Sequence, residues 1–572
     1  MAFLANIQKT KIVQYLFNAI ILAAFFILLI YSLINRKIMF TLFTNVSYYL
    51  IFLIFIVWVA QTTLFIKSLN FSIKASFEKY WLGIIIALIM TSLVFISVEV
   101  NFKTLSDETN LLSVSLSMLN DKNVLNTTMG KYYYGNLNPI NREIEKRPLM
   151  FPFMLNLLHS LIGFRYQNAF IFNYIVLFLL LVGIYIAVQQ FSDVPSSIAA
   201  MFLVLSYPVV TIFGVSGGFD LLNSAFFVLL MAASYYFIKN PSSVAFAFIF
   251  ATLLVFANIR YESIGFLVIL PLLLIKKIKW QYFKDYSYLF CIIPLVSLPY
   301  LWQRILRPDV YQNPADTPLF SVNALTKNIA IFFTNLIDFK YFLPYAGFVS
   351  IASILIFAYL IIEILRRKIR LVNYQYYFLF VLAMSILAST GIYFCHFFGD
   401  CTHPSSARFF ITLSIILALG PVALKIFKPD TMSGKTILII SIICFLYYHP
   451  IAVEGRFINT LAGNRTTYHC MNWLSKINDK NILIISERPG QFTAMGYGAI
   501  NFAYANKNNI QILKEAKRHL FSKIIVFQEI KYNDNNPTTQ TVLDANYKLT
   551  TLYEIQITAT EFLRISEVQT PM

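Results

Sequence analysis

The chain has 572 residues, of which 58% are hydrophobic and only 13% are charged. Soluble globular proteins carry about 25% charged residues, so this composition excludes an ordinary soluble domain. The net charge of +18 could indicate nucleic-acid binding. The basic residues cluster at the ends of apolar runs, however, where they set membrane topology. No basic patch resembles a nucleic-acid module, and we expect no nucleic-acid partner.

Apolar runs of membrane-spanning length recur along the chain. About 20 apolar residues are needed to cross the hydrocarbon core. The first run is followed by further apolar segments and by no small-residue cleavage site, so it is interpreted as a retained helix and not as a signal peptide. We expect about 13 transmembrane helices, near residues 13–34, 46–66, 81–99, 168–190, 197–214, 221–238, 242–257, 262–275, 286–303, 344–363, 374–394, 408–424 and 436–451.

The basic clusters predict the orientation of these helices. Clusters near residues 67–79, 276–279, 366–370 and 425–435 should face the cytoplasm. If the N-terminus is cytoplasmic and the chain crosses the membrane at each expected span, all of these clusters face the cytoplasm. This requires that the apolar stretch 148–163 lies at the outer membrane surface and does not cross the membrane. The sequence therefore predicts a multi-pass protein of the cell (inner) membrane, with a cytoplasmic N-terminus and an extracytoplasmic C-terminal tail.

The tail has a different pattern from the rest of the chain. Short apolar runs at 481–485, 523–527 and 562–565 alternate with an amphipathic stretch at 510–520, which is typical of a small α/β domain. The expected organisation is two N-terminal helices (1–80), a membrane-embedded catalytic module (81–455) with a long outer loop (100–147), and a small extracytoplasmic α/β domain (464–572).

Two polar elements of the outer loop are candidates for chemistry. Asp107 and Glu108 lie just beyond the third expected span. They could act in catalysis, or they could simply cap a helix. Glu145, Lys146 and Arg147 precede the apolar stretch. The two basic residues could grip a phosphate through charge-assisted hydrogen bonds, or they could be interfacial anchors.

Three further elements should reach the same membrane face. Asp220 begins an expected span after Ser216-Gly217-Gly218-Phe219. Arg260 and Glu262 lie between two short helices, and Arg408 opens a later span. Charged residues at the mouth of a helical bundle are functional candidates, because burying them unpaired is expensive. The alternative for the arginines is mutual ion pairing within the bundle.

This set of residues resembles the GT-C class of multi-spanning glycosyltransferases, which use polyprenyl-phosphate sugars. The similarity is greatest to the branch of aminoarabinose lipid A transferases and protein O-mannosyltransferases. In that family an Asp-Glu pair opens the first large outer loop, as Asp107 and Glu108 do here. A Lys-Pro-Pro-Leu-like element follows, matched here by Lys146-Arg147-Pro148-Leu149 with Arg147 in place of the first proline.

The resemblance implies sugar transfer from a polyprenyl-phosphate donor to a hydroxyl of a lipid, glycan or protein acceptor, within a membrane-lipid environment. Asp107 would be the general base, and Glu108 or Asp220 would orient the acceptor. The product would be inverted at the anomeric carbon. The motifs allow a divalent metal ion but do not require one. The residues expected to bind the leaving phosphate are Lys146, Arg147, Arg260 and Arg408, and Glu145 and Glu262 complete the expected site.

Two other functions are compatible with charged residues in a membrane bundle. A transporter or flippase of a lipid-linked saccharide would also need them, although no internal repeat typical of transporters is visible. A structural membrane component would leave the Asp-Glu and Lys-Arg-Pro elements unexplained.

One outer loop also contains Cys395 and Cys401 with two histidines. A disulfide is the first expectation, because oxidation is favoured outside the cell. Free thiols and a zinc site are the alternatives, although four ligands within nine residues would strain a zinc tetrahedron.

Overall fold

The computed structural model describes residues 11–69, 72–133, 136–307, 318–337, 345–366, 374–455, 462–477, 479–533, 536–539 and 543–569. The chain divides into two compact units. Unit 1 contains residues 1–100, 146–151 and 171–457, and unit 2 contains residues 101–145, 152–170 and 458–572. Each unit therefore combines segments that are far apart in the sequence.

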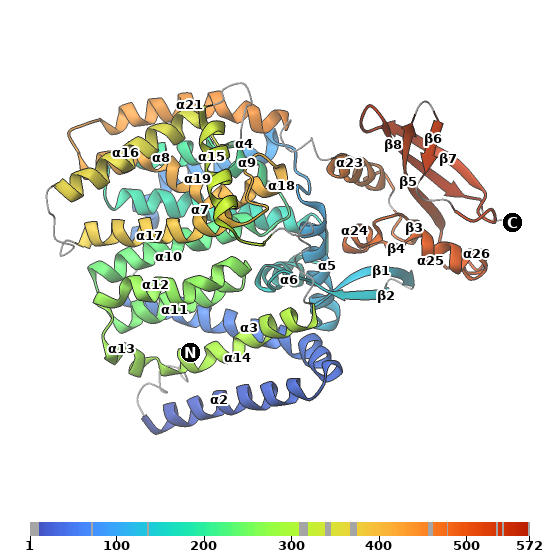
Figure 1. Cartoon of the computed structure of the whole chain (residues 1–572), viewed down its shortest axis with the longest axis horizontal. Helices are drawn as coiled ribbons and strands as arrows, with labels where there is room; N and C mark the ends of the chain where they lie inside the picture. Colours follow the sequence, from blue (N-terminus) through green and yellow to red (C-terminus); the bar gives the residue numbers. More distant parts are fainter. Residues whose placement is uncertain are drawn as a thin grey trace. The chain divides into compact units, whose positions relative to one another are not determined.

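The described residues of unit 1 form helices joined by loops, with one isolated β-bridge between Phe320 and His396, and many of the long helices pack along one another (Figure 1). Its α-helices are α2 (Lys11–Ile34), α3 (Arg36–Ser68), α4 (Ile73–Ser97), α7 (Asn168–Gln189), α8 (Val194–Leu205), α9 (Pro208–Gly214), α10 (Asp220–Lys239), α11 (Ser243–Ala257), α12 (Phe266–Leu274), α13 (Trp280–Asp285), α14 (Ser287–Leu306), α15 (Val322–Ile337), α16 (Gly347–Arg366), α17 (Tyr374–Cys395), α18 (Pro404–Ala407), α19 (Ile411–Ala418), α20 (Gly420–Phe427) and α21 (Gly434–Glu454), with short 3-10 turns η1 (Tyr261–Gly265), η2 (Ile275–Lys277) and η3 (Arg408–Phe410).

The described residues contain nine helices that are long and apolar enough to cross a membrane, or ten if the bent pair α8 and α9 forms one span. This confirms a multi-pass α-helical membrane protein, but not the expected count of about 13. The other three expected spans correspond to shorter apolar helices. The apolar parts of α11 and α16 have 17 residues or fewer, and α12 has nine residues with Pro271 inside it. Proline removes a helical hydrogen bond, so it favours interrupted helices.

Unit 2 is built on an eight-stranded mixed sheet with the order β2-β1-β4-β3-β5-β8-β7, and β6 pairs with β5. Strand β3 is parallel to its two neighbours, β4 and β5, whereas the other pairs are antiparallel. The strands are β1 (Leu125–Tyr133), β2 (Asn136–Ile144), β3 (Ile482–Ile485), β4 (Gly498–Ile500), β5 (Lys523–Asn533), β6 (Asn536–Thr539), β7 (Leu549–Gln556) and β8 (Glu561–Val568). The helices are α5 (Leu105–Asp121), most of α6 (Met150–Ile162), α23 (Ala462–Ser475), α24 (Pro489–Ala494), α25 (Phe502–Lys507) and α26 (Asn509–Lys517).

The two faces of this sheet are covered by different helices. Strand side chains alternate between the faces. Ile524 and Val526 of β5 pack in a core with residues of α25 and α26, such as Ile512. Phe527 points to the other face, where its ring stacks on Phe492 of α24 with centroids 5.0 Å apart. The expected α/β character of the C-terminal segment is confirmed. The sheet also includes two strands of the outer loop, which the sequence did not predict.

Candidate active site

Asp220 lies at the first position of α10, at the end of a tight turn in unit 1. The amide of Asn173 on α7 holds this turn, because it donates hydrogen bonds to the carbonyl oxygens of Ser216 (2.6 Å) and Gly218 (2.9 Å). Asn173 is fully buried within a largely apolar helix. Its burial is costly unless its amide is hydrogen-bonded, so these two bonds fix where Asp220 begins its helix.

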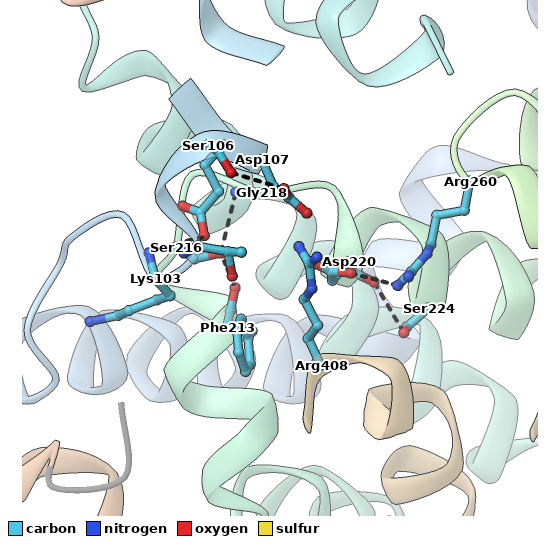
Figure 2. Close-up of polar contacts among 12 residues, drawn as sticks. Lys103, Ser106, Asp107, Phe213, Ser216, Gly218, Asp220, Ser224, Arg260 and Arg408 are labelled. Carbon is cyan, nitrogen blue, oxygen red and sulfur yellow. Dashed lines mark hydrogen bonds and ion pairs between the residues drawn. The ribbon is translucent and has the colours of Figure 1, made fainter. Parts of the chain in front are cut away.

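A network of ion pairs surrounds the Asp220 carboxylate (Figure 2). One oxygen accepts a hydrogen bond from Nη1 of Arg260 at 2.5 Å, and the other lies 3.6 Å from Nη1 of Arg408. Arg260 also contacts Glu262, with Nε 3.4 Å from the carboxylate. Asp220 and Arg260 are 3% exposed and Arg408 is 7% exposed. The structure therefore brings together four residues predicted from distant parts of the sequence.

Aromatic rings hold the two arginines as well. The guanidinium carbon of Arg260 lies 5.1 Å from the ring centroid of Phe219, 5.0 Å from that of Phe409 and 5.4 Å from that of Tyr393. Arg408 lies over the same two phenylalanines, at 6.0 and 5.5 Å. Cation–π contacts orient a guanidinium without neutralising its charge, so these rings position the two arginines in addition to their ion pairs.

Arg147 adds a third positive charge to this region of unit 1. It is buried, and its backbone carbonyl accepts a hydrogen bond from Gln303 at 2.9 Å. Burial, together with the positive charge of Arg408, lowers the pKa of Arg147 to about 9. The influence of Arg408 on this pKa indicates that the two cations share one environment. The cluster formed by Arg147, Arg260, Arg408, Asp220 and Glu262, called here the arginine cluster, has three guanidinium groups and two carboxylates.

The sequence did not single out one more cation, Arg304 at the end of α14. Its guanidinium carbon lies 5.1 Å from the ring of Tyr261 and 5.0 Å from that of Tyr300. Tyr261 stands between two members of the arginine cluster in the sequence. The available signal was a basic residue directly after an expected span. Lys146 is half-buried at the start of the same short segment as Arg147.

The Asp-Glu pair lies in unit 2, in the first turn of α5. The Glu108 carboxylate accepts hydrogen bonds from the backbone N–H groups of Lys103 (3.0 Å) and Thr104 (2.8 Å). Both groups immediately precede the first residue of α5, and a side chain of the first turn that reaches back to them caps the helix. Asp107 is 9% exposed, and it accepts a longer hydrogen bond from Ser106 at 3.4 Å. Glu145 also belongs to unit 2, where it is buried.

Metal ligation has little support in the described part of the chain. No group of three or more His, Cys, Asp and Glu side chains there could hold a metal ion.

The expected disulfide between Cys395 and Cys401 is wrong, because both cysteines are free thiols. Other contacts hold the loop in shape. The Sγ of Cys401 accepts a contact from the amide of Asn335 at 3.7 Å, and its carbonyl accepts a hydrogen bond from the hydroxyl of Tyr345 at 2.8 Å. The loop that precedes Arg408 is therefore fixed by noncovalent contacts.

No protein-family model matches the sequence, and no curated protein matches it in sequence. Among solved structures, the chain is similar to ArnT from Cupriavidus metallidurans in the apo state, with 8% identity and a TM-score of 0.47 over 86% of this chain and 98% of that chain. It is also similar to the apo Archaeoglobus fulgidus oligosaccharyltransferase, with 10% identity and a TM-score of 0.45 over 79% of this chain and 70% of that chain. The structure of the same ArnT bound to undecaprenyl phosphate has 10% identity and a TM-score of 0.36 over 86% and 98% of the two chains. At 8–10% identity, such similarities do not carry an activity from one protein to another, and the function is inferred below from the site residues.

Proposed function

We propose that this protein is a membrane glycosyltransferase that moves a sugar from a polyprenyl-phosphate donor to an acceptor hydroxyl at the outer face of the membrane. The observation that carries the proposal is the arginine cluster, in which Arg260 and Arg408 pair with Asp220 and the buried Arg147 is close enough for the charges of Arg408 and Asp220 to act on it. Guanidinium groups present several N–H donors in a planar fork, which matches the geometry of phosphate oxygens. Buried guanidinium groups gathered at one place are therefore suited to binding the phosphate of a lipid-linked donor.

The arginine cluster would act on the leaving group. When the bond between the anomeric carbon and the phosphate oxygen breaks, the electron pair stays on the phosphate, which becomes more negative. Preorganised cations stabilise that charge as it develops. Arg408 and Arg260 are held by Asp220 and by aromatic rings, so little reorganisation is needed during the reaction. Arg147 and Lys146 would add further donors to the phosphate.

Asp107 would act on the acceptor. A carboxylate can remove the proton of the attacking hydroxyl, and the new bond then forms between the acceptor oxygen and the anomeric carbon. Attack opposite the leaving phosphate inverts the configuration at that carbon. Glu108 accepts hydrogen bonds from two backbone N–H groups at the start of α5. Because these bonds hold the Glu108 carboxylate, Asp107 is the better candidate for the base. Asp220 is engaged with two arginines, which favours a role in holding them.

The test separates this reaction from transport. A deletion strain should accumulate a polyprenyl-phosphate sugar, which mass spectrometry of its lipid extract identifies. The purified protein is then incubated with this lipid and with a membrane extract as the acceptor source. A transferase releases free polyprenyl phosphate in step with sugar transfer, whereas a flippase leaves the phosphate–sugar bond intact. Absence of release by the wild-type protein would refute the proposal.

A further inference from the structure

The outer loop and the C-terminal segment form a single sheet in unit 2, although more than 300 residues separate them. Strand β1 of the loop pairs with β4, with Gly130 opposite Ala499. The approach is close at this point. A Cβ atom on Gly498 would lie 3.0 Å from the backbone nitrogen of Tyr132. The glycine therefore allows β1 to join the C-terminal sheet.

A small network of hydrogen bonds around the backbone of Thr127 connects α5 to the C-terminal segment. The backbone carbonyl of Thr127 on β1 accepts a hydrogen bond from the Oγ1 of Thr493 on α24 at 2.7 Å and one from the Oγ of Ser113 on α5 at 3.3 Å. The Ser113 hydroxyl in turn accepts from the N–H of Thr127 at 2.9 Å. All three residues are at most 3% exposed. Leaving a buried backbone group without a hydrogen-bond partner costs folding free energy, so this network fixes the register of α5 against β1 and α24.

Side chains further along the hairpin strengthen the same connection. Lys131 of β1 forms an ion pair with Glu515 of α26 at 2.7 Å, and these side chains are 4% and 13% exposed. The ring of Tyr133 stacks on Phe521, with centroids 5.9 Å apart. Removing one partner from a buried ion pair is strongly destabilising, so the hairpin depends on the C-terminal segment for its position.

Helix α5 is also held from a second direction within unit 2. The Oγ of Ser115 lies 3.1 Å from Nε2 of His159 on α6, and Nδ1 of His159 lies 2.9 Å from the amide nitrogen of Asn168. Because an amide nitrogen only donates, Nδ1 accepts and Nε2 carries the proton. His159 therefore donates a hydrogen bond to Ser115, and this bond links α6 to α5.

We infer that the C-terminal segment is a positioning element for Asp107, and that Thr493 is a positioning residue which acts through Thr127 and Ser113 on α5. The inference rests on the proposed role of Asp107 as general base. Asp107 lies six residues before Ser113 on the same helix, α5. A small misplacement of a catalytic group lowers the rate strongly, because catalysis depends on near-attack geometry. The C-terminal segment thus contributes to turnover without contacting the reacting atoms.

The test compares Thr493→Val with Thr493→Ser in the full-length protein. Valine keeps the shape and loses the hydroxyl donor, whereas serine keeps the donor. Release of polyprenyl phosphate from the accumulated donor lipid gives kcat and KM. We expect Thr493→Val to lower kcat roughly tenfold, as for the loss of a buried hydrogen bond, with KM for the donor changed less than twofold. Thr493→Ser should recover most of the rate. Thr551→Val, an exposed threonine on β7, is the matched control.

Hydrogen–deuterium exchange provides a readout that does not depend on activity. Amides of α5 should exchange at least several-fold faster in Thr493→Val, and at the wild-type rate in Thr493→Ser and Thr551→Val. Wild-type kcat or unchanged exchange of α5 in Thr493→Val would overturn the inference. A wild-type protein that releases no polyprenyl phosphate would instead refute the proposed function, so the two failures are distinguishable.

Discussion

Replacing Asp220 with asparagine tests whether this carboxylate holds the arginine cluster together. Asparagine keeps the size of the side chain and removes its charge. The Arg260–Asp220 pair is 2.5 Å long, and its side chains are 4% and 3% exposed. Removing one partner of such a buried pair costs roughly 3–5 kcal/mol. Arg260 retains Glu262 and three aromatic rings, so we expect a loss near the lower limit, about 3 kcal/mol.

The control is Asp193→Asn, because Asp193 forms an ion pair of the same length with Lys425. The Asp193 side chain is 47% exposed, and asparagine preserves its capping of α8. An exposed pair contributes about 0–1 kcal/mol. Equilibrium unfolding of the purified proteins in mixed micelles measures both variants. Equal stability losses for Asp220→Asn and Asp193→Asn would refute the role of Asp220.

The same substitution also makes a prediction about ligand binding. Asp220→Asn adds one net positive charge to the arginine cluster, so an anionic lipid should bind to it and stabilise the folded state by mass action. Adding undecaprenyl phosphate should therefore recover part of the lost stability, whereas an uncharged polyprenol of the same length should not. Equal effects of the two lipids would show that the cluster does not bind the phosphate.

Four further predictions address other residues. Arg147→Gln removes one of three guanidinium groups, and it should weaken undecaprenyl phosphate binding roughly tenfold in a binding titration, consistent with the loss of about 1.4 kcal/mol for one charged hydrogen bond. Glu108→Ala removes the cap of α5 and should lower the unfolding free energy by about 1 kcal/mol, whereas Glu108→Gln retains an acceptor oxygen and should lower it less. Burial lowers the pKa of His159 to about 4, so the unfolded chain binds a proton between pH 6.5 and 4 that the folded chain does not. Stability should fall by roughly 3 kcal/mol as the pH drops through this window, and His159→Gln should remove that dependence. Cys395 and Cys401 should both alkylate without reductant, and an intact mass that shows a disulfide would contradict the free thiols.

Sequence reasoning predicted the charged residues of the site better than the residues that position them. Asp220, Arg260 and Arg408 lie at the ends of apolar helices, where charge is conspicuous and topology predicts a common face. Asn173 was overlooked, although a lone amide in an apolar span is a recognisable signal. Phe219 and Phe409 look like ordinary apolar residues, and only their distances to the guanidinium groups reveal their contribution.

The outer loop was harder to predict for physical reasons. The hairpin β1–β2 is rich in polar residues, and the exposed and half-buried positions of β2 follow no regular alternation, so no apolar period of two marks it as a strand. Its partner β4 has only three residues and follows more than 300 residues later. This strand pairing depends on contacts between residues that are far apart in the sequence, and such contacts cannot be predicted from local sequence patterns. The C-terminal runs at 481–485 and 523–527 were predicted, because they are short, apolar and rich in β-branched residues.

Measuring transfer by Asp107→Asn tests the central claim most directly. The matched control is Asp121→Asn, an identical change at the other end of α5, where Asp121 is 45% exposed and forms a surface ion pair with Arg142. Release of polyprenyl phosphate from the accumulated donor lipid should fall roughly 10²–10⁴-fold in Asp107→Asn, as expected for the loss of a general base. Asp121→Asn should release it at the wild-type rate, and undecaprenyl phosphate should bind to both variants as it binds to the wild type. Wild-type release by Asp107→Asn would contradict the proposed mechanism.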